Sequence, residues 1–289
     1  MSLVKNRVKF LCAALLVALS VFVLSGCGAK APQKVTKAPT PKQVNMVLAS
    51  TTSTQDSGLF DVLIPAFEKA NPTIKVQVVA IGTGEAIQKG RDGDADCLLV
   101  HAKSDEEQFV KDGYADSRAD VMYNQFVIVG PANDPAKIAG SKTAAEAFKK
   151  IADEKAKFVS RADDSGTNKK ELKIWKAAGI TPSGSWYKKS GQGMGETLKM
   201  VDELGAYTLT DQATYLVMEK EKAIESKVLF AGAPDLFNQY GVLVVKGAKQ
   251  EAAAQTFHDW ILSKEAQQTV IKNFGTADFG SPLFTPNAK

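Results

Sequence analysis

From residue 44 onward, short runs of apolar and β-branched residues alternate with segments whose apolar residues recur at helical spacing. The runs predict strands at residues 44–49, 74–79, 96–100, 121–129, 158–159, 206–209 and 240–245. The amphipathic segments predict helices at residues 59–70, 85–90, 105–112, 144–153, 171–179, 196–204, 212–220, 251–262 and 264–274. Repeated strand–helix units of this length predict an α/β fold with a mostly parallel sheet covered on both faces.

Two long apolar runs, residues 121–129 and 240–245, are interpreted as extended crossings between two lobes. The first lobe then comprises residues 44–125 and 240–289, and the second comprises residues 126–239. Strand C-terminal ends and helix N-termini would point into the cleft between these lobes, which is where α/β folds bind their ligands.

The N-terminal segment has the layout of an export signal. Three basic residues precede an uncharged apolar run at residues 10–24, which is short for a membrane span. A basic region followed by a short apolar region is typical of a secretory signal, so we expect residues 1–26 to be a signal peptide.

The signal ends on Leu24-Ser25-Gly26-Cys27, which resembles the lipobox of bacterial lipoproteins. The resemblance implies cleavage before Cys27 and a lipid on its sulfur, which would hold an exported protein at the outer face of the cell membrane or in the periplasm. The alternative is an ordinary signal peptide that contains a cysteine. Residues 27–43 contain Pro and Lys but no acid, and they predict a flexible tether.

Charge and cysteine content narrow the possible functions. Seven of the 36 Lys and Arg residues precede residue 44, where none of the 32 Asp and Glu residues occurs, so residues 44–289 carry a net charge of −3. The basic balance of the whole chain is therefore no argument for nucleic-acid binding. Only Cys97 lies in this body, which excludes an internal disulfide and a metal site with two thiolates there. We expect Cys97 to be buried in a strand.

Residues 160–171 read as a strand end, a polar loop and the start of a helix. A helix N-terminus has unpaired N–H groups and a partial positive charge, so it can bind an anion. The loop adds the cation Arg161 and the hydroxyls of Ser165 and Thr167, and Gly166 permits close approach to the backbone. The alternative is that an Asp or Ser of this loop only caps the helix.

Three other loops, residues 50–58, 82–85 and 191–196, have a similar hydroxyl- or glycine-rich composition and also precede helices. One such helix start is common in proteins. Several of them, spread over both predicted lobes, favour a shared anionic ligand.

Groups for catalysis are scarce. The two histidines, His101 and His258, do not form an HExxH zinc pattern, and neither a GK[ST] phosphate loop nor a GxSxG elbow occurs. The glycines at residues 191–195 do not match the dinucleotide fingerprint, which needs Gly where Glu196 stands. We therefore expect no enzyme, no cofactor and no metal site.

Six segments together resemble the tungstate-binding lipoproteins of bacterial ABC importers, a branch of the periplasmic-binding-protein superfamily. They are residues 50–59, 82–84, 121–124 with 126–131, 160–161 with 163–167, 191–195, and 206–211. The resemblance implies a type II fold whose two lobes clamp tungstate or molybdate and deliver it to a membrane permease and its ATPase. It further implies attachment to the membrane through the lipid anchor, and we expect a monomer.

By matching position, the resemblance implies oxyanion contacts from Thr51, Thr52, Ser53, Thr83, Arg161, Ser165, Gly166 and Thr167. Tungstate is a fully deprotonated tetrahedral dianion, so its site needs hydrogen-bond donors only. A protonated phosphate would also need an acceptor, and Asp163 and Asp164 could supply one. A receptor for phosphate or sulfate is therefore the alternative, although we expect these carboxylates to cap the helix or hold Arg161.

Three positions depart from the family pattern. Ala162 stands where the family usually has Gly, Asn168 where it has His, and Gln212 where it has Arg. Ala162 would affect the loop if the family Gly adopts a positive φ, and the other two would remove donors or charge at the rim. These departures leave the ligand class unchanged but bear on affinity and on the preference between tungstate and molybdate.

Overall fold

A computed structural model describes residues 42–289. The predicted signal peptide, the predicted lipidation site Cys27 and the predicted tether as far as residue 41 lie outside the described residues. The strands are β1 (Val44–Thr51), β2 (Ile74–Ile81), β3 (Cys97–Val100), β4 (Ala119–Gly130), β5 (Phe158–Ser160), β6 (Tyr187–Lys189), β7 (Thr208–Asp211), β8 (Lys227–Phe230), β9 (Phe237–Val244) and β10 (Thr285–Pro286).

The helices agree closely with the amphipathic pattern. They are α1 (Thr52–Asp56), α2 (Leu59–Ala70), α3 (Thr83–Arg91), α4 (Lys103–Lys111), α5 (Ala144–Asp153), α6 (Gly166–Ala177), α7 (Met194–Leu204), α8 (Gln212–Lys220), α9 (Glu251–Leu262) and α10 (Thr276–Phe279). The helix predicted at residues 264–274 is a π-helix, Ala266–Val270, followed by a 3₁₀ turn, Ile271–Asn273. No helix within residues 42–289 has the length and apolarity that a membrane crossing needs.

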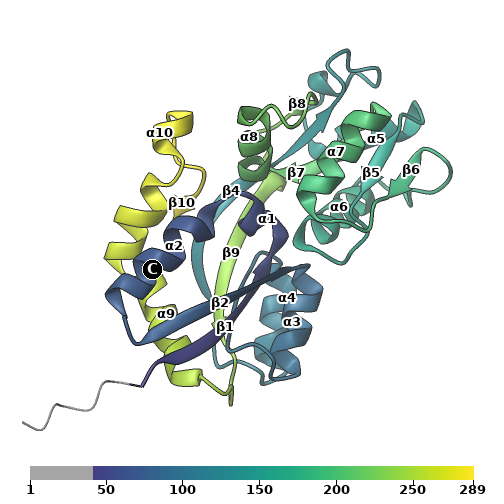
Figure 1. The fold of residues 1–289 in the computed structure, drawn as a ribbon. Helices are drawn as coiled ribbons and strands as arrows, with labels where there is room; N and C mark the ends of the chain where they lie inside the picture. Colours follow the sequence, from purple (N-terminus) through teal and green to yellow (C-terminus); the bar gives the residue numbers. More distant parts are fainter. Residues whose placement is uncertain (1–41) are drawn as a thin grey trace, which may run out of the picture. The chain divides into compact units, whose positions relative to one another are not determined.

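The sheet is more antiparallel than predicted. β1 pairs in parallel with β2 and β3, whereas β9 is antiparallel to β3 and to β4. β4 also pairs antiparallel with β7, β8 and β10. The expectation of a mostly parallel sheet is therefore wrong. The reason is that the two long strands, β4 and β9, run in opposite directions past each other (Figure 1).

β4 changes partners part-way along its length. Residues 119–125 pair with β9, and residues 126–130 pair with β7 and β8. The apolar side chains divide at the same place. Met122 belongs to a core with Phe67 and Phe257, and Phe126 belongs to another with Phe148 and Trp175. Each fully buried side chain of this size stabilises the fold by about 1.5–3 kcal/mol.

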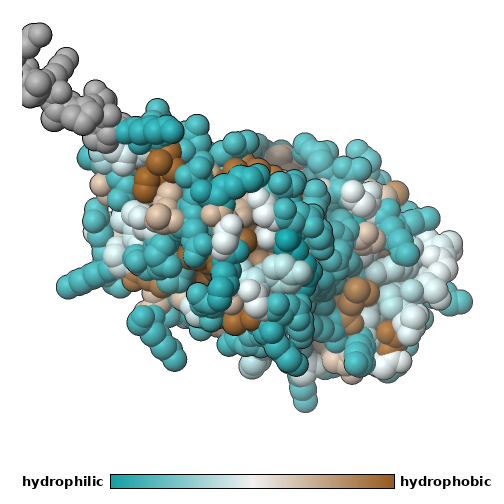
Figure 2. All heavy atoms as spheres, turned by 90° about the horizontal axis from the view of Figure 1, so that it is seen from below, coloured by the Kyte–Doolittle hydropathy of each residue, from teal (hydrophilic) through white to brown (hydrophobic). Residues whose placement is uncertain are grey.

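Helices cover both faces of the part of the sheet that β1, β3 and β9 form. α2 and α9 pack on one face of β1, β3 and β9, and α3 and α4 lie on the other (Figure 1). Cys97 is fully buried in β3, as predicted. Hydrophilic residues dominate the face drawn in Figure 2, with apolar groups scattered among them.

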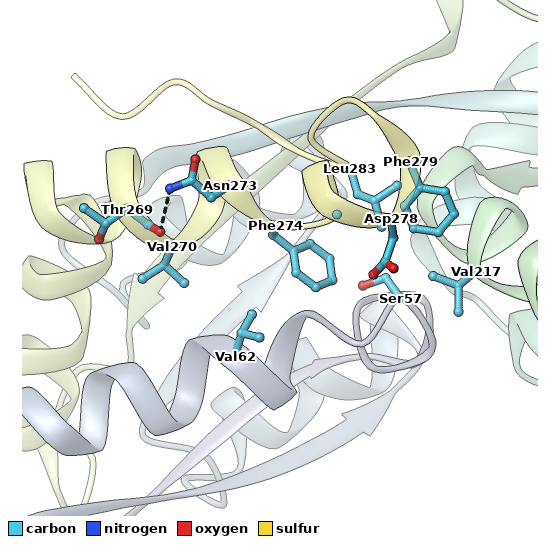
Figure 3. A pocket seen from close by; sticks show the side chains of 11 residues that line it. Ser57, Val62, Val217, Thr269, Val270, Asn273, Phe274, Asp278, Phe279 and Leu283 are labelled. Atoms are coloured by element: carbon cyan, nitrogen blue, oxygen red, sulfur yellow. Dashed lines mark hydrogen bonds between the residues drawn. The ribbon is translucent and has the colours of Figure 1, made fainter.

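A groove near the C-terminus is lined by Val62, Phe274 and Phe279 together with Asp278 (Figure 3). Its lining includes neither Lys nor Arg, so it does not suit an anion. The residues that were predicted from the sequence to bind an anion lie elsewhere, where α1, α3 and the β5–α6 loop meet.

Candidate anion-binding site

The β5–α6 loop is organised by its own side chains. Ser165 is the N-cap of α6, and its Oγ accepts the backbone N–H of Asn168 at 3.2 Å. Asp163 Oδ1 accepts the N–H of Ser165 at 3.2 Å. Ser165 thus caps α6. A capping hydroxyl accepts with a lone pair and keeps its own proton for a ligand.

Arg161 is the cation of this loop and is 2 % exposed. Its Nη2 donates to Asp163 Oδ2 at 2.6 Å and to Thr52 Oγ1 at 3.0 Å, and its Nε donates to the carbonyl of Gln192 at 3.2 Å. Asp163 therefore holds Arg161, as expected. Nη1 is buried and has no partner within residues 42–289. A buried guanidinium nitrogen without an acceptor is costly, so this atom indicates where an anion would bind.

Thr167 adds a second unused donor. It lies in the first turn of α6, is buried, and its Oγ1 has no hydrogen-bond partner among the described residues. Leaving a buried hydroxyl unpaired costs about 1–3 kcal/mol. A ligand with acceptor oxygens would recover that free energy.

The loop after β1 is helical, contrary to the expected loop conformation at residues 50–58. Thr51 caps α1, and its Oγ1 lies 2.7 Å from Thr54 Oγ1 and 3.3 Å from Ser53 Oγ. These hydroxyls form a chain of mutual hydrogen bonds. Thr52, the first residue of α1, reaches Arg161 through the bond described above.

Two further bonds join α3 to the β5–α6 loop. The N–H of Gly166 donates to Thr83 Oγ1 at 3.1 Å, and the N–H of Gly84 donates to the carbonyl of Asp164 at 3.2 Å. A Cβ on Gly166 would lie 2.6–2.8 Å from the ring of His101, closer than side chains tolerate. Glycine at 166 therefore allows the two sides to meet. Hydrogen bonds thus bring all four predicted loops together.

His101 supports this site, and sequence reasoning assigned it no partner. Its ring is buried, and Nδ1 lies 2.9 Å from Asn238 Oδ1 while Nε2 lies 3.4 Å from Ser53 Oγ. Burial lowers the pKa of His101 to about 4, so the ring is neutral at pH 7. Asn238 in turn donates to Asn124 Oδ1 at 2.7 Å. The two partners of the ring come from β9 and α1, and they lie 137 and 48 residues away in the sequence.

Two carboxylates near the site were also missed. Asp211 caps α8 by accepting the N–H of Thr214 at 2.9 Å, and its Oδ2 has no partner within residues 42–289. Burial raises the pKa of Asp211 to about 6. Asp56 accepts the N–H of Gly195 at 3.3 Å, and burial raises its pKa too. The signal for Asp211 was its place between a strand and a helix, which is typical of an N-cap.

The three departures from the family pattern have different surroundings. Ala162 has φ +50°, a left-handed conformation that costs a residue with a Cβ about 1–2 kcal/mol. Asn168 is buried rather than at a rim, because its Nδ2 donates to Ser160 Oγ at 3.2 Å and to Glu171 Oε2 at 3.3 Å. The expectation that Asn168 lies at the rim was therefore wrong. Gln212 is exposed at the start of α8.

Comparisons with known proteins place the chain in a family. Residues 36–265 match the model described as PBP superfamily domain, where PBP denotes periplasmic binding protein. The tungstate-binding protein TupA of Peptoclostridium acidaminophilum is 46% identical over 98% of this chain and 99% of its own length. The chain belongs to the TupA family of periplasmic binding proteins. This membership confirms the predicted fold class.

Solved structures of TupA-like proteins agree with this assignment. The tungstate ABC transporter structure from Geobacter sulfurreducens is 47% identical, with a TM-score of 0.71, and the match covers 78% of this chain and 97% of that chain. The tungstate-binding protein TupA from Desulfovibrio alaskensis G20 is 41% identical, with a TM-score of 0.69, over 85% of this chain and 99% of that one. One of these structures is named for a tungstate ABC transporter and the other for tungstate binding.

Proposed function

We propose that this protein binds tungstate or molybdate between its two lobes and delivers the anion to the permease and ATPase of an ABC importer. The observation that carries the proposal is the buried guanidinium of Arg161, whose Nη1 has no acceptor in the described part of the chain while Nη2 reaches across to Thr52. Its TupA relatives are named for tungstate binding, which supports the choice of ligand.

The donor set suits an anion that has no proton to give. Arg161 and the hydroxyl of Thr167 have unused hydrogens, and Thr83 and Ser165 each accept a backbone N–H and keep their own hydroxyl proton. Further donors would come from Thr51, Thr52 and Ser53 and from the start of α6 at Gly166. Hydrogen bonds to a charged ligand contribute about 1.5–3 kcal/mol each.

The ligand would hold the lobes together. Residues 44–125 with 240–289 form the first lobe of the proposal, and residues 126–239 form the second. We place the hinges near Gln125 and Tyr240, where β4 exchanges β9 for β7 and β8 as its partner. Closure would exclude water and complete the donor shell. We further propose that the protein is exported, carries a lipid on Cys27, is tethered to the membrane and is a monomer.

A receptor for phosphate is the second candidate, and Asp211 is the observation that favours it. Its buried Oδ2 has no partner among the described residues and could accept the proton of hydrogen phosphate. Asp163 is less suitable, because its oxygens already accept from Arg161 and from the N–H of Ser165.

Thermal unfolding with each of four anions tests the proposal. A ligand at about 100 times its Kd stabilises the folded state by about 2.7 kcal/mol, so tungstate and molybdate should raise the melting temperature clearly. Phosphate and sulfate at the same concentration should not. A larger shift with phosphate would favour the second candidate, and no shift with any of the four would contradict both.

A further inference from the structure

A cavity of about 380 Å³ lies beside the candidate site. Four lysines line it: Lys103 on α4 and Lys169, Lys170 and Lys173 on α6. His101 and Gly166 also line the cavity, and both belong to the candidate site. The cavity therefore borders the proposed oxyanion position on the side where α4 faces α6.

Two of the four lysines form no ion pair within residues 42–289. Lys170 Nζ donates to the backbone carbonyl of Asp235 at 3.0 Å, and Lys173 Nζ donates to Ser104 Oγ at 3.1 Å. Neither ammonium has a carboxylate within 4.0 Å in residues 42–289. By contrast, Lys169 pairs with Asp105 at 2.8 Å and Lys103 with Glu107 at 3.9 Å.

The charges of these two lysines act on each other. The pKa of Lys170 is lowered, first by burial and then by the charge of Lys173, while the charge of Asp235 acts in the opposite direction. The carboxylate that lines the same cavity, Asp120, forms an ion pair with Arg118. Lys170 and Lys173 thus leave two ammonium groups at the cavity without an ion pair among the described residues, and a bound anion would pair with them.

These two positive charges contrast with the net charge of the body. Residues 44–289 carry a net charge of −3, so the folded body as a whole does not attract a dianion. A concave surface of the opposite sign concentrates anions and raises association rates by about 10–1,000-fold. Lys170 and Lys173 lie on α6, whose first residue, Gly166, also lines the cavity.

We infer that the cavity lined by Lys170 and Lys173 is a capture site, which binds divalent oxyanions weakly and feeds them to the Arg161 site when the lobes part. The inference rests on the proposed function, and it adds a second binding position that acts on the rate of association.

The test is the association rate of tungstate, followed by tryptophan fluorescence in a stopped-flow instrument. In the variant Lys170→Gln/Lys173→Gln, the association rate constant should fall by about 3–10-fold at about 10 mM salt, where the screening length is about 30 Å. The loss should shrink at about 150 mM salt, where that length is about 8 Å. The dissociation rate constant should stay within about twofold, because these lysines do not touch the final site.

The matched control is Lys142→Gln/Lys176→Gln. Both lysines are exposed, lie outside the cavity and have no carboxylate within 4.0 Å among the described residues, and the variant carries the same net charge as the test variant. An equal loss in the control would reduce the effect to net charge and overturn the capture site. An unchanged rate in the test variant would overturn it as well.

Folding and function are checked separately. Lys170 Nζ lies 5.6 Å from the centre of the Phe126 ring, so its replacement could destabilise the second core. The single variant Lys173→Gln, at an exposed position, should show part of the rate loss with an unchanged melting temperature. If the wild-type protein binds no tungstate, the proposed function fails. If it binds and both double variants associate equally fast, only the capture site fails.

Discussion

The candidate site has two walls, one formed at α1 and one at the β5–α6 loop, and they differ in whether their hydrogen-bond donors already have partners. On the α1 wall, the hydroxyls of Thr51, Ser53 and Thr54 bond to one another, so they are satisfied before any ligand arrives. On the β5–α6 wall, Arg161 Nη1 and Thr167 Oγ1 are buried and unpaired within the described residues. The donors of the α1 wall are therefore satisfied without a ligand, whereas those of the β5–α6 wall carry a desolvation free energy that a bound anion removes.

This difference predicts where the binding free energy is concentrated. Rotating a hydroxyl proton from a neighbour to a ligand exchanges one hydrogen bond for another. Giving an acceptor to a buried unpaired donor recovers its full desolvation cost. We therefore expect substitutions on the β5–α6 wall to reduce affinity more than equivalent substitutions on the α1 wall.

The largest effect should come from Arg161→Glu. Reversing the one formal cation of the candidate site places a carboxylate against a dianion and beside Asp163, so binding of tungstate should fall by more than about 100-fold. Arg161→Lys should weaken binding less, because it keeps the charge but loses the planar fork. Titration calorimetry measures both. Unchanged affinity in Arg161→Glu would remove this wall from the site.

His101, which lies against Ser53 of the α1 wall, should make the free energy of unfolding depend on pH. His101 has a pKa of about 4 in the folded state against about 6.5 when unfolded, so the unfolded chain binds the proton first as pH falls. The free energy of unfolding should therefore decrease between pH 6.5 and pH 4. His101→Gln should lose about 2 kcal/mol less than wild type between pH 7 and pH 4.5 in urea unfolding.

The buried carboxyl of Asp211 acts in the opposite sense. Its pKa is raised to about 6, so it binds its proton in the folded state first and adds stability as pH falls below 6. Comparing His101→Gln with wild type at each pH cancels this contribution. Parallel pH profiles for the two proteins would contradict the assignment to His101.

A pair of threonine substitutions compares the two walls directly. Thr167→Val should weaken tungstate binding by about 1–3 kcal/mol, because it removes an unpaired buried donor. Thr51→Val should reduce affinity less but should cost about 1 kcal/mol of stability, since Thr51 caps α1. Calorimetry and thermal unfolding of both variants check this reciprocal pattern. Equal affinity losses would show that the walls do not differ.

The smallest effect concerns the backbone of the second wall. Ala162 has φ +50°, so Ala162→Gly should raise the free energy of unfolding by about 1 kcal/mol. Ala156→Gly, at a position outside the positive-φ residues, is the control and should lower stability slightly. Urea unfolding measures both changes. A destabilised Ala162→Gly would mean that the loop is not strained at this residue.

Much of the fold could be predicted because its helices have local signals. α2, α5, α8 and α9 begin and end at the predicted residues, since apolar spacing and boundary residues act within one or two turns. α1 was missed because five polar residues carry no apolar period. Its conformation depends on the cap at Thr51 and on a bond from Thr214 Oγ1 to the carbonyl of Ser53.

The candidate site divides in the same way. Arg161 and the hydroxyl-rich loops are visible in the sequence, because a helix N-terminus after a strand has a recognisable local composition. The partners of His101 are not visible, since Asn238 lies 137 residues away and reaches the ring only through the pairing of β9 with β3 and β4.

The sequence by itself determined the class of fold, the family and the chemistry of the candidate donors, because periodicity, composition and motif order are local properties of the chain. Only the tertiary structure decided which donors stay unpaired, which carboxylate holds Arg161 and which of the described lysines form no ion pair. Those properties depend on distances between segments far apart in the chain, and such distances exist only after the strands have paired and the cores have packed.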